Sequence, residues 1–148
     1  GAGRAARRGG VGLVCGGAVM GGEWFAWVRE LGSGRDEKFP HVRRAEIGDG
    51  GEIRANSTSD RGALEVTRIG RGAKIDNLVH IGHNCQIGEN VVIAAQTGLP
   101  GSIVIERDVV LGGQAGIGKP APLDEGAMLA VQCCVLRKKV VRVTGWAF

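Results

Sequence analysis

The sequence predicts an all-β protein, a parallel β-helix built from six-residue units. Three observations predict this fold. An aliphatic residue returns at every sixth position from Ile69 to Val141, the fourth residue after it is mostly small or β-branched, and glycine often follows it directly. A period of six matches neither the helical repeat of 3.6 residues nor the alternation of one strand. The left-handed form is the one this pattern usually builds, although the period itself does not define the hand.

Each six-residue unit is expected to form one flat side of a triangular coil, so that three units complete a turn. Stacking of the coils then buries the repeated aliphatic side chain. Thirteen units in unbroken register make chance unattractive as an explanation, because random aliphatic residues lose phase within a few units. The repeated residues are Ile69, Ile75, Ile81, Ile87, Ile93, Leu99, Ile105, Leu111, Ile117, Leu123, Leu129, Val135 and Val141.

A second inward position lies four residues after each aliphatic residue. Its side chains are small or β-branched until Lys139, near the end of the chain, breaks the pattern. The members are Ala73, Val79, Cys85, Val91, Thr97, Ile103, Val109, Ala115, Ala121, Ala127 and Cys133.

Glycines directly after the aliphatic residue are expected to form the corners of the coil, where a permissive backbone is useful. Gly70, Gly82, Gly88, Gly112 and Gly118 occupy this position.

The composition fits one domain with an aliphatic core. The 148 residues are 43% hydrophobic and 23% charged, with 27 glycines but only three Trp, three Phe and no Tyr. The formal charge is +4, and basic residues gather near both ends. Solvated ends explain that charge, so we expect no nucleic-acid partner.

Four cysteines without a CxxC pair favour reduced thiols in a cytoplasmic protein. Residues 1–13 are expected to form a basic flank, because glycines interrupt the apolar run that would resemble a signal peptide. The β-helix is then expected over 14–148, and no segment is long enough to span a membrane.

Two departures interrupt the repeat. A loop excursion is expected at about 21–41, containing the aromatic segment 24–27; it is either functional or packs over the open end of the helix. Between Ile53 and Ile69 lie two units plus four extra residues, which places Ser59 at a position where an inward aliphatic residue is expected.

Histidines on the coil are the strongest candidates for chemistry, since the interior is filled by aliphatic side chains. His80 and His83 fall on outward positions, and Asp76 precedes them by about one unit. An imidazole can accept a proton near neutral pH, and a carboxylate can orient it. The alternative is that these histidines are ordinary polar surface residues without a catalytic role.

Several runs resemble UDP-3-O-acylglucosamine N-acyltransferase, the LpxD family. The resemblance covers roughly residues 14–136. The specific runs are Ala55-Asn56-Ser57-Thr58, Asp60-Arg61-Gly62-Ala63-Leu64, Lys74 to Asn84, Ile87-Gly88-Glu89-Asn90 and Ala94-Ala95-Gln96-Thr97-Gly98.

The resemblance implies a homotrimer of left-handed β-helices in lipid A biosynthesis. Such enzymes move a 3-hydroxyacyl chain from acyl carrier protein to the 2-amine of a UDP-glucosamine acylated on O3. The resemblance implies that His83 is the catalytic base and that Asp76 supports it. We expect His80, Phe25 and Asn84 to contact substrate, and we expect no cofactor and no metal.

The chain also departs from that family. Pro120 stands where the family usually carries a second histidine, and the family's Gly-Phe-Gly-Phe run is Trp24-Phe25-Ala26-Trp27, which retains only Phe25. The resemblance does not extend to the family's N-terminal uridine-binding domain or to its C-terminal helical extension. A catalytically impaired trimeric scaffold, or another hexapeptide O- or N-acyltransferase, therefore stays open. A zinc hydratase is disfavoured because the spacing of His41, His80 and His83 does not resemble that class.

Overall fold

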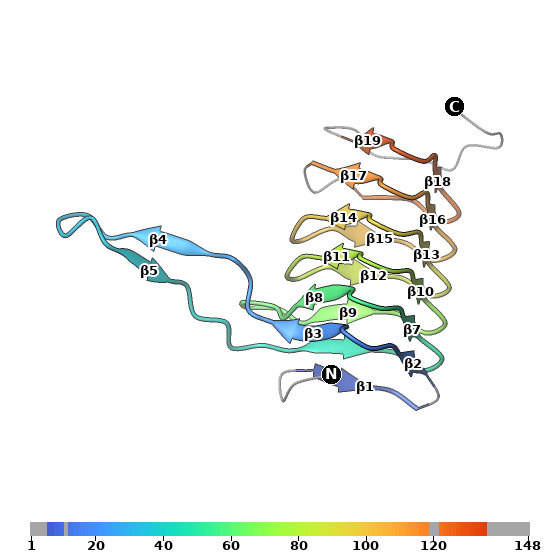
Figure 1. Ribbon diagram of the computed structural model, residues 1–148, viewed down its shortest axis with the longest axis horizontal. Helices are drawn as coiled ribbons and strands as arrows, with labels where there is room; N and C mark the ends of the chain where they lie inside the picture. Colours follow the sequence, from blue (N-terminus) through green and yellow to red (C-terminus); the bar gives the residue numbers. More distant parts are fainter. Residues whose placement is uncertain (1–5, 11, 119–121, 136–148) are drawn as a thin grey trace.

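The computed structural model describes residues 6–10, 12–118 and 122–135. It is a left-handed parallel β-helix whose coils are built from three parallel sheets. A long hairpin projects from its lower coils (Figure 1). The all-β prediction is confirmed. We name the three faces of the β-helix after a central strand of each.

The β12 face is a sheet of five parallel strands in the order β1-β6-β9-β12-β15. Its first strand, β1, lies within the residues expected to form a basic flank, and pairs with β6. The strands are β1 (Ala6–Arg8), β6 (Ala45–Ile47), β9 (Thr67–Ile69), β12 (Gln86–Ile87) and β15 (Val104–Ile105).

The β10 face has six parallel strands, and its lower end is closed by β2, which pairs with β7. The strands are β2 (Leu13–Val14), β7 (Glu52–Ile53), β10 (Lys74–Ile75), β13 (Val92–Ile93), β16 (Val110–Leu111) and β18 (Met128–Leu129).

The β11 face also has six parallel strands, and it carries both coil histidines near its strand ends. The strands are β3 (Val19–Gly22), β8 (Thr58–Asp60), β11 (His80–Ile81), β14 (Gly98–Leu99), β17 (Gly116–Ile117) and β19 (Cys134–Val135).

The registers confirm three units per coil. Ile75 pairs with Ile93, and Ile93 with Leu111, each pair being 18 residues apart. Both inward positions are buried: Ile93 and Val91 are 0% exposed. Burial of one such side chain contributes roughly 1.5–3 kcal/mol, so the column of stacked aliphatic residues is the main source of stability.

The four-residue insertion is also confirmed, because Ile47 pairs with Ile69 across 22 residues instead of 18. Ser59 occupies the inward position opposite Ile81 and is 1% exposed. Its hydroxyl has no hydrogen-bond partner among the described residues. This coil is therefore packed less favourably than its neighbours.

The expectation about corner glycines is wrong. The left-handed backbone lies two residues later than expected, at positions such as Asn84 (φ 60°) and Asn90 (φ 55°). Glycine after the aliphatic residue is required instead by the next coil: a Cβ on Gly70 would lie 2.5 Å from the carbonyl carbon of Gly88. Close approach of stacked coils, and not a strained φ, explains these glycines.

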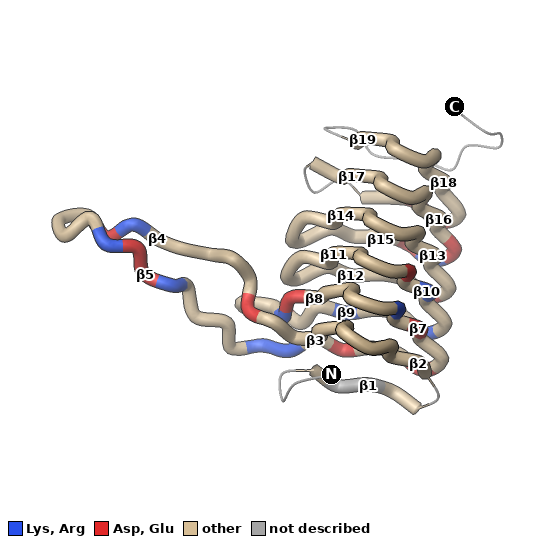
Figure 2. The backbone as a smooth tube through the Cα atoms, viewed as in Figure 1, with Lys and Arg blue, Asp and Glu red and all other residues tan. Residues whose placement is uncertain are grey.

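The excursion forms an antiparallel hairpin of β4 (Trp27–Arg29) and β5 (Asp36–Lys38). It extends away from the coils instead of packing over the open end of the helix (Figure 1). Both acidic and basic residues lie along it (Figure 2), and Arg29 pairs with Asp36 at 2.9 Å. Pro120, Ala121 and Val141 lie outside the described residues.

Candidate active site

His83 lies in the turn that follows β11. Its imidazole stacks on the indole of Trp24, with ring centroids 3.7 Å apart and planes inclined by 29°. The Nδ1 atom is buried and has no hydrogen-bond partner among the described residues. The Nε2 edge faces the backbone of Gly101, where a Cβ would come within 2.1 Å of Nε2. The ring therefore fits between an indole and a glycine.

Trp24 and His41 stand at the two ends of the excursion, so the hairpin brings both to the coil. Their rings meet edge-on, with centroids 5.9 Å apart and planes at 88°. Phe39 contacts the other side of His41 in a similar geometry, at 6.1 Å. His41 is only 8% exposed, and neither of its ring nitrogens has a hydrogen-bond partner within the described part of the chain.

Ion pairs fasten the base of the hairpin beside these rings. The Glu23 carboxylate pairs with both Lys38, at the end of β5, and Arg61, in the loop after β8. The hydrogen bond from Lys38 is the main cause that lowers the pKa of Glu23. This carboxylate is exposed, so the contact positions the hairpin more than it stabilises the fold.

His80 is held by the coil below it. Its Nδ1 lies 2.9 Å from the Thr58 hydroxyl, and its Nε2 lies 3.7 Å from a carboxylate oxygen of Asp60. Burial raises the pKa of Asp60, while the neighbouring His80 and His41 act in the opposite direction. The three side chains meet because β8 pairs with β11.

Burial lowers the pKa of the His83 imidazole below its ordinary value, and the nearby His41 lowers it further. His83 is therefore neutral at physiological pH and able to accept a proton. The proton it accepts would be stabilised by the face of Trp24, because the quadrupole of an indole attracts a cation. The arrangement can act as a general base.

Asp76 is not brought to His83 within one chain. It follows β10 and lines a hollow of about 330 Å³ on the β10 face, together with Arg54 and Lys74. One oxygen of Asp76 accepts a hydrogen bond from the backbone N–H of Asn77, at 2.8 Å. No hydrogen bond or ion pair joins Asp76 to His83 in the described residues.

The other residues expected to contact substrate differ in how available their side chains are. Phe25 is 87% exposed, so its ring is available to a partner. The side-chain carbonyl of Asn84 accepts a hydrogen bond from the backbone N–H of Ala63 at 3.1 Å and so holds the loop after β8. His80 is half exposed, and its ring edge is directed by Thr58 and Asp60.

Three residues of this site escaped the sequence analysis: Trp24, His41 and Asp60. Trp24 and His41 reach His83 only through the path of the hairpin, which periodicity does not predict. Asp60 could have been found. Once the four-residue insertion is counted, Thr58 falls one coil below His80, and Asp60 follows it by two residues.

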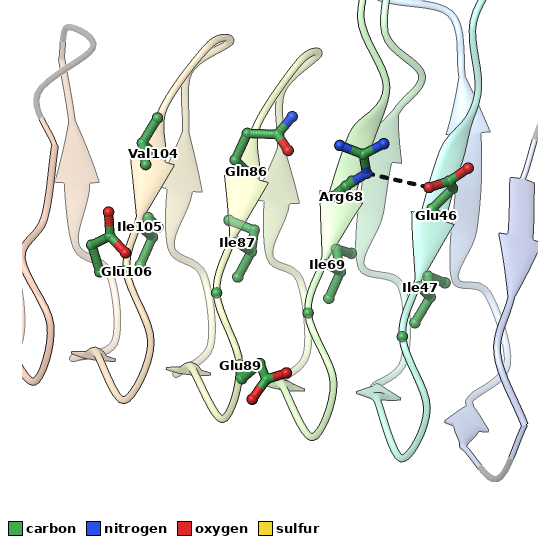
Figure 3. Close-up of a pocket in the computed structure, with 13 residues that line it drawn as sticks. Glu46, Ile47, Arg68, Ile69, Gln86, Ile87, Glu89, Val104, Ile105 and Glu106 are labelled. Carbon is green, nitrogen blue, oxygen red and sulfur yellow. Dashed lines mark hydrogen bonds and ion pairs between the residues drawn. The ribbon is translucent and has the colours of Figure 1, made fainter.

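A larger hollow, of about 460 Å³, lies elsewhere, on the β12 face (Figure 3). An ion pair of 3.3 Å between Arg68 and Glu46 crosses it, and Gln86 and Val104 continue the row. It is an open sheet surface without histidine, and we do not assign it as the site. Among the described residues, no three His, Cys, Asp or Glu side chains are grouped as a metal would require. The same residues contain no helix able to span a membrane.

Comparison with known proteins gives consistent matches. The family described as bacterial transferase hexapeptide (six repeats) matches residues 67–101. A UDP-3-O-acylglucosamine N-acyltransferase from Methylobacterium sp. (strain 4-46) is 47% identical over 118 residues, which are 80% of this chain and 33% of that protein. One from Dechloromonas aromatica (strain RCB) is 54% identical over 88 residues, or 60% of this chain and 25% of that protein.

A solved structure supports the fold. The UDP-N-acetylglucosamine O-acyltransferase from Moraxella catarrhalis RH4 superposes with a TM-score of 0.75 at 26% identity, covering 90% of this chain and 49% of that chain. This chain spans about a third of the length of the first of these N-acyltransferases. It therefore belongs to the hexapeptide-repeat β-helix proteins and, over 118 residues, is similar to UDP-3-O-acylglucosamine N-acyltransferase.

Proposed function

We propose that this chain transfers a 3-hydroxyacyl group from acyl carrier protein to the 2-amine of UDP-3-O-acylglucosamine, in the cytoplasm, with His83 as general base. The observation that carries the proposal is the neutral His83 imidazole against Trp24, in a chain similar to enzymes named for this acceptor. An amine that attacks a thioester must lose a proton, and a positioned imidazole is suited to accept it.

The step balances with the groups named. The amine nitrogen forms a bond to the thioester carbonyl carbon, and its proton passes to Nε2 of His83. The carbon–sulfur bond then breaks, and the proton returns to the departing thiolate of the carrier. The Trp24 face stabilises the imidazolium that exists between these two transfers, by roughly 0.5–2 kcal/mol.

The β11 face offers space for the acyl chain. Along its outward row, Thr58 pairs with His80, His80 with Gly98, and Gly98 with Gly116. A Cβ on either glycine would meet nothing within 4 Å. A strip without side chains therefore runs up the helix from His80, and an extended hydrocarbon chain fits such a strip when a second subunit covers it.

A homotrimer would supply that cover and a place for Asp76. Because Asp76 and His83 lie on different edges of one β-helix, Asp76 would support the His83 of a neighbouring subunit. The test mixes Asp76→Asn with His83→Ala chains. Mixed trimers then contain sites in which both residues are native. Activity well above that of either variant alone would mean that Asp76 of one subunit supports His83 of its neighbour. No recovery in trimers of proven mixed composition contradicts it.

A hydroxyl acceptor is the second candidate, because the fold also superposes on an O-acyltransferase. An acceptor panel separates the two. The protein is incubated with 3-hydroxyacyl carrier protein and either UDP-3-O-acylglucosamine or UDP-N-acetylglucosamine, and the products are identified by mass spectrometry. We expect an amide product with the first acceptor. An ester product with the second alone would replace the proposal with O-acylation.

A further inference from the structure

Thr58, His80 and Asp60 place a hydroxyl, an imidazole and a carboxylate side by side on the β11 face. The Nδ1 atom of His80 is 2.9 Å from the Thr58 hydroxyl, and its Nε2 atom is 3.7 Å from a carboxylate oxygen of Asp60. The register explains this order, because Thr58 pairs with His80 and Asp60 follows Thr58 by two residues on the same face of β8. A hydroxyl beside a base that a third group orients is the arrangement that activates a nucleophile.

The carboxylate of this row is largely buried. The Asp60 side chain is only 13% exposed, and His80 is its one ion-pair partner in the described part of the chain. Burying a carboxylate is unfavourable unless a partner offsets the loss of hydration. An amide or a hydroxyl in this place would hold the ring of His80 without that penalty. The carboxylate is therefore best explained by the positive charge that His80 gains when it accepts a proton.

Asp60 also determines which ring nitrogen of His80 is free to accept a proton. An ionised carboxylate only accepts hydrogen bonds, so it favours the tautomer that carries a proton on Nε2. Nδ1 then presents its lone pair to Thr58, whose hydroxyl can donate to it. The proton of the Thr58 hydroxyl thus has an acceptor within hydrogen-bond distance.

The row is open to an acyl donor. The His80 side chain is 53% exposed, and Thr58 is partly exposed. His80 pairs with Gly98, the first residue of the strip without side chains that runs up this face. A thioester whose acyl chain lies along that strip has its carbonyl carbon at the His80 end, beside Thr58.

We propose that Thr58 is a second acyl acceptor, with His80 as its general base and Asp60 as the positioning residue of His80. The Thr58 oxygen forms a bond to the thioester carbonyl carbon, and its proton passes to Nδ1 of His80. The carbon–sulfur bond breaks, and this proton passes to the departing thiolate. Water then adds to the ester carbonyl and gives a proton to the same imidazole, which returns it to the departing Thr58 oxygen. The net reaction consumes one water and releases a 3-hydroxy acid and the carrier thiol.

This second activity is hydrolysis of the acyl donor when no amine acceptor is bound. It rests on the proposed function for its natural donor, the 3-hydroxyacyl carrier protein. The nucleophile itself does not depend on that donor, because a small activated ester such as p-nitrophenyl butyrate presents a carbonyl carbon open to the same attack.

The test incubates the full chain with 3-hydroxyacyl carrier protein, without any UDP-sugar, and follows conversion of the carrier to its free thiol by mass spectrometry. In parallel, p-nitrophenyl butyrate is the donor and release of p-nitrophenolate is measured. Thr58→Val is β-branched and suits the strand but has no hydroxyl, so we expect release to fall to the background rate. Thr58→Ser keeps the hydroxyl and should retain release. His80→Gln should slow release by roughly 10²-fold or more.

Peptides from acid-quenched protein identify the acylated residue by its added mass. Ser33 is the internal control, because its hydroxyl donates to the Glu30 carboxylate and not to an imidazole. We expect the acyl group on Thr58. Equal labelling of Ser33 and Thr58, or release that is unchanged in Thr58→Val, overturns the proposal.

Asp60→Asn tests the positioning role separately. The ring ¹⁵N signals of His80, assigned with His80→Gln, should show the proton on Nε2 in the native chain. An amide can donate as well as accept, so Asp60→Asn should give a mixture of the two tautomers together with slower release. An unchanged tautomer with unchanged release would contradict the role of Asp60.

The two proposals fail in different ways. Amide product from UDP-3-O-acylglucosamine, without Thr58-dependent release from either donor, supports N-acylation and overturns the Thr58 nucleophile. Thr58-dependent release from p-nitrophenyl butyrate, without transfer to the UDP-sugar, overturns N-acylation and supports the nucleophile.

Discussion

The indole of Trp24 and the imidazole of His83 are stacked, with centroids 3.7 Å apart, although 59 positions separate them in the chain. The hairpin excursion makes this contact possible, because it leaves the coil at Trp24 and returns at His41. A general base with one face against an indole gains a partner for its protonated form.

Loss of that indole should slow transfer. Trp24→Leu is expected to lower kcat/KM by roughly 2- to 30-fold, the range that a cation–π contact of about 0.5–2 kcal/mol supports. Trp24→Phe keeps an aromatic face and should retain most activity. The comparison uses steady-state rates at saturating carrier protein. Equal rates for the Leu and Phe variants would show that the aromatic face contributes nothing.

Gly101 should be irreplaceable for the position of His83. A Cβ there would lie 2.1 Å from Nε2, so Gly101→Ala must push the imidazole away from its place. We expect a large loss of activity and a changed His83 NMR signal, with little change in overall fold. Gly16→Ala is the control, since a Cβ at Gly16 meets nothing within 4 Å and Gly16 has no positive φ. An active Gly101→Ala enzyme would contradict the placement of the ring.

Stability should depend on pH through His83. Burial lowers the pKa of His83 in the folded chain, so the unfolded chain takes up the proton first as the pH falls. The contribution of neutral His83 to the free energy of unfolding is fully present above about pH 6.5, the pKa of an unfolded histidine. It is lost as the pH falls through the lower pKa of His83 in the folded chain. Urea unfolding at pH 7.5 and pH 5.0 tests this. His83→Gln should lose less stability between the two than the native chain; equal losses would refute the assignment.

Cys85 should be unreactive in the folded chain. Burial raises the pKa of its thiol to about 11, and its Sγ donates a hydrogen bond to the carbonyl of Pro100 at 3.1 Å. Alkylation requires the thiolate, so iodoacetamide at pH 8 should modify the exposed Cys134 and spare Cys85. Peptide mass spectrometry reads both sites, and urea provides the control in which both react. Modification of Cys85 at the rate of Cys134 would indicate that this coil opens.

A ladder of amides should stabilise one edge of the β-helix. The Gln114 amide donates to Gln96 at 2.7 Å and accepts from Gln132 at 2.8 Å, while its own backbone is left-handed (φ 58°). Gln114→Ala loses both bonds and keeps the strain, so we expect a loss of roughly 1–2 kcal/mol. Gln114→Gly removes the strain as well and should be about 1 kcal/mol more stable than the Ala variant. Equal urea midpoints for the Ala and Gly variants would show that the left-handed backbone at Gln114 causes no strain.

The coil was predictable because its physics is local and repeated. An aliphatic residue at every sixth position can be buried at every side of the prism only by three units per turn, and Ile75, Ile93 and Leu111 stack accordingly. The left-handed backbone was expected at the wrong position. It lies at the third residue after the aliphatic one, where Asn, Gln, Ser, Asp or Gly usually stands and where Leu78 (φ 59°) stands in one unit. Glycine two positions earlier is needed for a different reason: the backbone of the next coil lies too close for a Cβ.

The site was predictable only in part. His80 and His83 follow from the repeat, since outward positions can be counted. The partners of His83 do not, because Trp24 and His41 depend on how a hairpin outside the repeat turns back to the coil. Asp76 matches the family pattern by its spacing from His83. Spacing along the chain does not tell whether the two side chains lie on the same edge of the β-helix.

The most direct test of the account is the yield of amide product from UDP-3-O-acylglucosamine by native chain and His83→Ala, measured by mass spectrometry on protein shown to be folded. A general base of this kind contributes roughly 10²- to 10⁴-fold, so we expect the variant to lose turnover in that range. Turnover that survives the substitution unchanged would contradict the role given to His83.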